Sequence, residues 1–467
     1  MTLAFEPIPP VRLRPEHRVF LGLDPADSHK RVWSSASDSV GIVGPPRYGK
    51  TSGIIIPALL YWAGPVVSTS TRGDILAATG DWRRRIAQAA GGRVYVYDPF
   101  GSEGLGTATL RWSPLAGCAD PSVCYRRVQA MTAVAGGGIT DADHWRSGAA
   151  LILRGLFHAA ALADAPMSEV RRWIARQDVR RPAELIRTHP GAAEGWADDL
   201  EALPLLGERE RGSFYSVART CLEATAEPRV LESCSAVDLD IDEFLRTNSS
   251  LYVVGPSHYQ DAIAPMIVGL VDAIAQRAAE VAVGQGGRLA SPLLLALDEV
   301  ANIAPLRSLP SLVSEGGGRG IITLWAAQSL AQLRARYGAD AQQAILTATT
   351  AKLIYGGVAN DADLRNISAW AGEHRTPEVT LFGGGIDPAL LPPDRLRALG
   401  TPADTARQHS ISGSYRPILP VEAIQQMPPH HAWLWWRSEP PLHVETRPAG
   451  LIPEYQRVAG YTPEHQP

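Results

Sequence analysis

The stretch Asp38-Ser39-Val40-Gly41-Ile42-Val43-Gly44-Pro45-Pro46-Arg47-Tyr48-Gly49-Lys50-Thr51 decides the fold of this chain. Residues 38–43 are a short, mostly apolar run, which predicts a buried strand. Residues 44–51 match G-x-x-x-x-G-K-[ST], a loop that cradles phosphates with backbone N–H groups and a lysine. The segment from Thr51 to Leu60 has the pattern of a helix, whose N-terminus would also face the phosphates. Strand, loop and helix in this order predict a nucleotide-binding α/β domain.

The basic residues support this interpretation of the loop. The chain has 44 lysines and arginines, and the only lysines are Lys30, Lys50 and Lys352. A phosphate-binding loop needs a compact ammonium, which arginine replaces poorly. The alternative is a Gly/Pro turn beside a solvated lysine. Because proline has no N–H, the backbone N–H groups that donate hydrogen bonds to phosphate would begin at Arg47, after the two prolines. The predicted nucleotide-binding residues are Gly44, Pro45, Pro46, Arg47, Tyr48, Gly49, Lys50, Thr51 and Ser52.

Composition excludes several classes of protein. The 467 residues carry a formal net charge of −4, so a nucleic-acid partner would have to be held by a local patch or pore. The four cysteines form no C-x-x-C pair and no metal spacing, so we expect core thiols in a reducing compartment. We expect no signal peptide and no transmembrane helix. The longest apolar stretches, Ile54–Gly64 and Ile263–Ala275, are too short or contain an aspartate.

Alternating strand and helix patterns predict a parallel sheet that is interrupted by a helical insert. Further strands are expected at 64–71, 93–98, 250–255, 292–299, 321–327, 351–356 and 432–437, with helices at 75–90 and 264–283. Residues 376–402 are expected to be loop. The predicted parts are an extended lead-in (1–38), a nucleotide-binding domain in two pieces (39–121 and 245–450), an all-α insert (122–244) and a Pro-rich tail (451–467).

Two carboxylates and a glutamine end neighbouring predicted strands. Asp298 and Glu299 follow an apolar strand, and Mg²⁺ prefers carboxylates together with phosphate oxygens. Asp298 is therefore the expected Mg²⁺ carboxylate beside the Thr51 hydroxyl, and Glu299 is placed to deprotonate an attacking water. The alternative is a strand that ends in a solvated turn. Gln328 ends the next strand, at the edge where α/β sheets bind ligands, and can contact the water or the γ-phosphate.

Taken together, these residues resemble the type IV secretion coupling proteins of the TraG/TraD kind, over about residues 30–440. The segments that carry the resemblance are Gly44–Thr51, Leu293–Asn302, Ser314–Gly320, Ala327–Leu333 and Lys352–Gly357. The arginine- and alanine-rich composition suggests a GC-rich bacterial source, and the amino-acid sequences of the motifs resemble those of actinobacteria.

The resemblance implies a RecA-like P-loop NTPase fold with a central parallel sheet and an inserted all-α domain. It implies ATP and Mg²⁺ as cofactors and a homo-hexameric ring with nucleotide between subunits. It also implies a channel for DNA, expected to be single-stranded with an attached relaxase, and type IV secretion components as partners. By position, Lys50 and Thr51 hold phosphate and Mg²⁺, Gln328 senses the γ-phosphate, and Arg319 reaches a neighbour's nucleotide. The alternative for Arg319 is a solvated loop cation.

Two features depart from the family's pattern. Family members begin with transmembrane helices, and no such run is visible here, so we expect a cytoplasmic protein at the inner face of the membrane. Its anchor is then a separate protein, or the chain is a soluble variant or a fragment. Tyr48 stands where a small residue is common.

Other functions share parts of this pattern. An FtsK/HerA-like translocase of double-stranded DNA has the same site, an adaptor would keep nucleotide without motor activity, and a small-molecule kinase is a further alternative.

Several weaker features receive structural interpretations. Arg83-Arg84-Arg85 is expected to be a solvated helix end, and Trp173 to lie in a helical core. His430-His431 is expected at the surface. Arg72 or Asp74 is placed to touch nucleotide or a neighbouring subunit.

Overall fold

An eleven-stranded sheet forms the centre of the protein in a computed structural model that describes residues 17–101, 109–135, 142–382 and 408–452. Its strand order is β2-β1-β13-β12-β9-β3-β8-β7-β4-β6-β5. The strands from β9 to β5 pair in parallel. They are β3 (Val40–Val43), β4 (Val66–Ser70), β5 (Val94–Tyr97), β6 (Ser250–Val254), β7 (Leu293–Leu297), β8 (Ile321–Ala327) and β9 (Ala351–Tyr355).

All seven parallel strands lie within ranges predicted from the sequence, so this part of the prediction is confirmed. Their apolar runs are continuous because helices cover both faces of a parallel sheet, and β7 and β8 are buried at every position. The segments that connect them are η1 (Thr51–Ile55), α1 (Ile56–Tyr61), α2 (Asp74–Ala89), η4 (Ser257–Tyr259), α11 (Gln260–Gly284), α12 (Leu309–Arg319), α13 (Leu330–Tyr337) and α14 (Ala339–Ala348). No helix among the described residues combines the length and apolar character needed to cross a bilayer.

The remaining four strands pair antiparallel at one edge of the sheet. They are β1 (Phe20–Asp24), β2 (Asp27–Trp33), β12 (His431–Trp436) and β13 (Leu442–Glu445), followed by η6 (Ala449–Leu451). The prediction of an extended lead-in over 1–38 was wrong for 20–33, which form a hairpin beside β13. An edge strand such as β2 is polar and charged, which protects it from pairing with other chains and also hides its apolar alternation.

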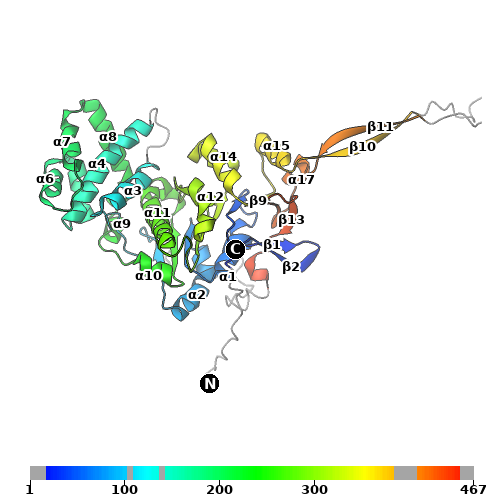
Figure 1. Cartoon of the computed structure of the whole chain (residues 1–467), viewed down its shortest axis with the longest axis horizontal. Coiled ribbons are helices and arrows are strands. Elements are labelled where there is room, and N and C mark those ends of the chain that lie inside the picture. The colour runs from blue at the N-terminus through cyan, green and yellow to red at the C-terminus, as the bar shows by residue number, and fades with distance from the viewer. Residues whose placement is uncertain (1–16, 102–108, 136–141, 383–407, 453–467) are drawn as a thin grey trace, which may run out of the picture. The chain divides into compact units, whose positions relative to one another are not determined.

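The segment between β5 and β6 contains helices and no strand in its described residues. They are α3 (Pro121–Thr132), α4 (Ala142–Leu162), α5 (Met167–Arg176), α6 (Arg180–Thr188), α7 (Trp196–Ala202), η2 (Leu203–Leu205), α8 (Glu208–Cys221), η3 (Glu223–Ala226), α9 (Pro228–Ser233) and α10 (Ile241–Arg246). Figure 1 shows α4, α6, α7 and α8 gathered in one group, and α3 packs against α11. Trp173 and all four cysteines are buried, and the cysteines are free thiols, as expected.

Residues 357–426 form a second, smaller compact unit, which the sequence did not predict. It contains α15 (Asp361–Trp370), β10 (Glu373–Phe382), β11 (Gln408–Pro417) and α17 (Val421–Gln425). The prediction of loop over 376–402 was wrong for 376–382, which belong to β10, while 383–402 lie outside the described residues. Pro377 favoured a loop in the prediction, but β10 pairs only with β11 and so tolerates a residue without an N–H. The predicted tail, 451–467, lies almost wholly outside the described residues.

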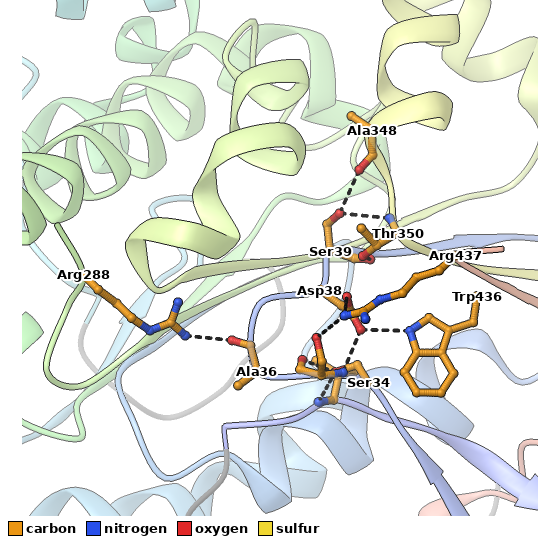
Figure 2. Close-up of polar contacts among 11 residues, drawn as sticks. Ser34, Ala36, Asp38, Ser39, Arg288, Ala348, Thr350, Trp436 and Arg437 are labelled. Atoms are coloured by element: carbon orange, nitrogen blue, oxygen red, sulfur yellow. Dashed lines mark hydrogen bonds and ion pairs between the residues drawn. The ribbon is translucent and has the colours of Figure 1, made fainter. Parts of the chain in front are cut away.

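Figure 2 shows the polar contacts that fix the chain just before β3. Asp38, 1% exposed, accepts hydrogen bonds from Trp436 Nε1 at 2.9 Å and from Arg437 Nη2 at 2.9 Å. Arg288 Nη2 donates to the Ala36 carbonyl at 2.8 Å. These contacts join the amino end of β3 to β12 and to the loop before β7. The opposite, carboxyl end of β3 is therefore presented by a fixed strand.

The arginine run in α2 is only partly solvated. Arg84 and Arg85 are exposed, as predicted, but Arg83 is completely buried, so the prediction was wrong for this residue. Its guanidinium fills a pocket of carbonyl oxygens at the amino ends of β4 and β6.

Candidate nucleotide site

The loop of residues 44–50 connects β3 to η1 at the carboxyl edge of the sheet. Two of its residues have left-handed backbone conformations, Arg47 with φ +66° and Gly49 with φ +95°. The Gly49 carbonyl accepts from the Gly53 N–H at 2.8 Å, so the loop runs directly into the helix. Successive N–H groups in such a turn form a concavity that binds anions. The first helical turn is a π-helix, which the sequence did not predict.

Lys50 is held inside this loop. Its ammonium donates to the carbonyls of Gly44 at 2.7 Å and Pro45 at 2.8 Å, and the residue is 8% exposed. Burial lowers the pKa of Lys50, while the charges of Asp298 and Glu299 act in the opposite direction. An ammonium removed from water and positioned beside a phosphate-binding loop interacts strongly with any anion that enters it.

Thr51 and Asp298 meet across 247 positions of sequence. The Thr51 hydroxyl donates to Asp298 Oδ2 at 2.8 Å, because β7 and the loop after β3 end at the same edge of the sheet. Asp298 is 7% exposed, and burial raises its pKa to about 6 against the opposing effect of the Thr51 hydrogen bond. The site therefore holds hard oxygen donors, a carboxylate and a hydroxyl, which are suited to a Mg²⁺ ion.

The raised pKa of Asp298 predicts that its ionised carboxylate lowers the stability of the fold. The folded-state pKa of about 6 exceeds the unfolded value of 3.8, so the ionised carboxylate destabilises the nucleotide-free fold above pH 6. Since one pKa unit corresponds to about 1.4 kcal/mol, Asp298→Asn should stabilise the protein by roughly 2–3 kcal/mol at pH 7.5.

The gain from Asp298→Asn should shrink as pH falls from 6 to about 4, where wild type is also neutral at this position. Denaturant unfolding in EDTA at several pH values measures it. A gain that does not depend on pH would contradict the electrostatic explanation.

Glu299 lies next to Asp298 in a strained backbone conformation, with φ +49°. Its carboxylate accepts from Gln328 Nε2 at 3.3 Å and from Asn302 Nδ2 at 3.4 Å. Gln332 completes a closed network, because its Nε2 donates to Asn302 Oδ1 at 2.8 Å and its Oε1 accepts from the Gln328 N–H at 3.1 Å. A non-glycine residue held in the left-handed region is typical of functional sites.

The sequence placed Glu299 and Gln328 together, and the structure does so as well. It did not single out Asn302 and Gln332. The signal in the sequence was the spacing of these residues. Asn302 follows Glu299 by three positions and Gln332 follows Gln328 by four, so one helical turn could bring both amides back to the carboxylate.

Arg319 is not brought to the other predicted residues in this chain. It ends α12, at the amino end of β8, and pairs with Glu315 at 3.0 Å, whereas Gln328 follows the carboxyl end of β8. Arg72 is exposed, and Asp74 lies near enough to Asp298 to raise its pKa. Tyr48 packs against the central hydrophobic cluster, which explains an aromatic residue at this position of the loop.

A parallel sheet with β3, β8 and β7 side by side, the loop 44–51, and carboxylates after β7 define a P-loop NTPase with a RecA-like fold. A sequence profile of the family described as "Type IV secretory system Conjugative DNA transfer" matches residues 20–445, and the chain belongs to this family.

Individual relatives agree with this assignment. The conjugal transfer protein TraG of Escherichia coli is 25% identical over 337 residues, which cover 66% of this chain and 51% of TraG. The chain thus spans about half the length of the curated relatives it matches. Among solved structures, the bacterial conjugative coupling protein TrwBdeltaN70 has a TM-score of 0.64 at 17% identity, covering 88% of this chain and 84% of its own. TrwB in complex with ADP and Mg²⁺ has a TM-score of 0.63 at 18% identity, covering 88% and 85%.

Proposed function

We propose that this protein is the coupling ATPase of a conjugation system, which uses ATP hydrolysis to bring DNA to a type IV secretion apparatus. One observation carries the proposal. Lys50, Thr51, Asp298, Glu299 and Gln328 converge at a single edge of the sheet, in a chain of the conjugative DNA-transfer family.

Each of these site residues has a separate role in the proposed phosphoryl transfer. Backbone N–H groups from Arg47 to Thr51 and the Lys50 ammonium hold the phosphates. Thr51 and Asp298 would hold Mg²⁺, which would neutralise the negative charge that develops on the phosphates. Its fit here is supported by the convergent hydroxyl and carboxylate, and by the ADP and Mg²⁺ in the TrwB complex.

Glu299 takes the proton of the attacking water in this proposal, and Gln328 contacts the water or the γ-phosphate. Each oxygen of the Glu299 carboxylate already accepts one amide hydrogen bond, so the carboxylate is oriented before substrate binds.

Arg319 fits this scheme only as a residue that acts on a neighbouring subunit, because it sits at the opposite edge of its own sheet. A trans arginine would place nucleotide between subunits of a homo-hexameric ring, and an isolated monomer would then hydrolyse ATP slowly. Single-stranded DNA with its relaxase, together with secretion components at the inner face of the membrane, are the proposed partners.

Steady-state ATP hydrolysis measured against protein concentration, with and without DNA at low salt, tests the function. Cooperative activity that single-stranded DNA stimulates, and that Lys50→Ala abolishes, is the expected result. Stimulation by double-stranded DNA alone would favour an FtsK/HerA-like translocase. ATP binding without hydrolysis at any concentration would favour a substrate adaptor instead.

A further inference from the structure

The phosphate-binding loop is packed against a segment that lies almost 400 residues further along the chain. His430 precedes β12, and its imidazole lies directly over Gly49. A Cβ atom built on Gly49 would approach His430 Nδ1 to 2.3 Å, so only glycine allows this contact. Nδ1 is buried and has no hydrogen-bond partner. The ring therefore faces the loop at close range and the residue is half-buried, whereas the sequence predicted a histidine at the surface.

The backbone of His430 also holds the loop. Its N–H donates to the Tyr48 carbonyl at 3.0 Å. In a trans peptide the carbonyl and the N–H of the following residue point in opposite directions, so this bond turns the Gly49 N–H away from His430. A hydrogen bond at one end of a peptide group also polarises the donor at its other end. His430 thus orients and strengthens one of the N–H groups that line the loop.

The backbone of His430 is held in place by Thr446, which follows β13. His430 has a left-handed backbone, with φ +63°, and its carbonyl accepts from the Thr446 N–H at 2.6 Å. The buried Thr446 hydroxyl accepts from Tyr355 OH at 2.9 Å, and the Thr446 carbonyl sits where a Cβ on Gly53 would approach it to 2.2 Å. A residue held in this conformation by two elements of the sheet edge is over-determined by its surroundings, as functional positions commonly are.

We propose that His430 is a positioning residue of the nucleotide site, which sets the Gly49 peptide for phosphate binding from the side opposite the ligand. The inference rests on the proposed function, because it assigns His430 to the same phosphates. In this inference the antiparallel strands β12 and β13 hold the phosphate-binding loop in its binding conformation.

The test compares substitutions that differ in their tolerance of the left-handed region. Alanine resists φ +63° and removes the ring, whereas asparagine adopts this conformation readily and keeps a polar group. We expect His430→Ala to raise the dissociation constant of fluorescent ADP with Mg²⁺ about tenfold, with kcat for ATP changed by less than about twofold. His430→Asn should return the constant to within about threefold of wild type.

His431→Ala is the matched control, because the His431 imidazole hydrogen-bonds His443 at 3.1 Å and is not the ring that lies over Gly49. It should leave ADP affinity unchanged. An unaltered ADP affinity in His430→Ala overturns the inference. The inference also fails if His430→Asn does not restore ADP affinity and the loss of affinity is matched by a loss of thermal stability in the absence of nucleotide. If wild type itself binds no ADP, the proposed function fails as well, so the two failures are distinguishable.

Discussion

Replacing Glu299 with glutamine should reduce the rate of ATP hydrolysis about a thousandfold, while nucleotide affinity stays within about threefold of wild type. Glutamine has nearly the shape of glutamate but cannot accept a proton from water. Lys50 and Thr51, which are proposed to bind nucleotide and Mg²⁺ together with Asp298, donate to the Gly44 carbonyl and to Asp298, so neither hydrogen bond involves Glu299. The loss should therefore appear in kcat.

The structure indicates that the substitution is tolerated locally. One oxygen of Glu299 accepts from Gln328 Nε2 and the other from Asn302 Nδ2. The amide nitrogen of a glutamine at position 299 would face one of these donors. The side-chain amide of Gln328 can turn to present its oxygen, whereas Asn302 is held by Gln332. The network can thus reorganise at Gln328 without breaking the bond between Asn302 and Gln332.

Asn302→Ala is an informative comparison for this prediction. It removes one of the two amides that hydrogen-bond the Glu299 carboxylate but leaves the proposed base in place, so we expect a loss of about tenfold in kcat. Steady-state hydrolysis beside fluorescent-nucleotide binding measures both variants. Substantial hydrolysis by Glu299→Gln would assign the proton acceptor to another group, and an equal loss in both variants would mean that orientation outweighs basicity.

The sequence was sufficient for those parts of the site that depend on strand order and local motifs. Gly44–Thr51 is a continuous pattern, and Asp298, Glu299 and Gln328 each follow an apolar strand, so a parallel sheet brings them to one edge. This is why the Thr51 to Asp298 contact could be anticipated across 247 positions.

The parts that the sequence did not predict depend on contacts without a local pattern. His430 reads as one of two adjacent polar residues, and its contact with Gly49 follows from the packing of β12 against β9. The strand β2 has little apolar alternation because it is the edge strand of the sheet, whereas β1 is a short run that is buried at four of its five positions. Arg83 reads as one of three equivalent arginines, although helical periodicity turns it inward while Arg84 and Arg85 face water.

Arg83 is a buried cation that organises the turns before two strands. Its Nε donates to Ser250 Oγ at 2.7 Å, and Nη2 donates to the carbonyls of Gly64 at 2.8 Å and Asn248 at 3.3 Å. Nη1 donates to the Trp62 carbonyl. Burial lowers the pKa of Arg83 to about 10, so it stays charged at neutral pH. The planar guanidinium thus satisfies several buried carbonyls at once, which a lysine ammonium cannot match in geometry.

Arg83→Leu should therefore lower the free energy of unfolding by about 3–5 kcal/mol, because it leaves buried carbonyl oxygens without donors. Arg84→Leu is the matched control. Arg84 is the next residue of the same helix, is 44% exposed and forms an ion pair with the exposed Asp81, so its loss should change stability by less than about 0.5 kcal/mol. Denaturant unfolding of the two variants measures the difference. Similar stabilities would mean that water reaches the pocket and replaces the guanidinium, whereas a large difference would establish that Arg83 stabilises the turns before β4 and β6, at the end of the sheet opposite the candidate nucleotide site.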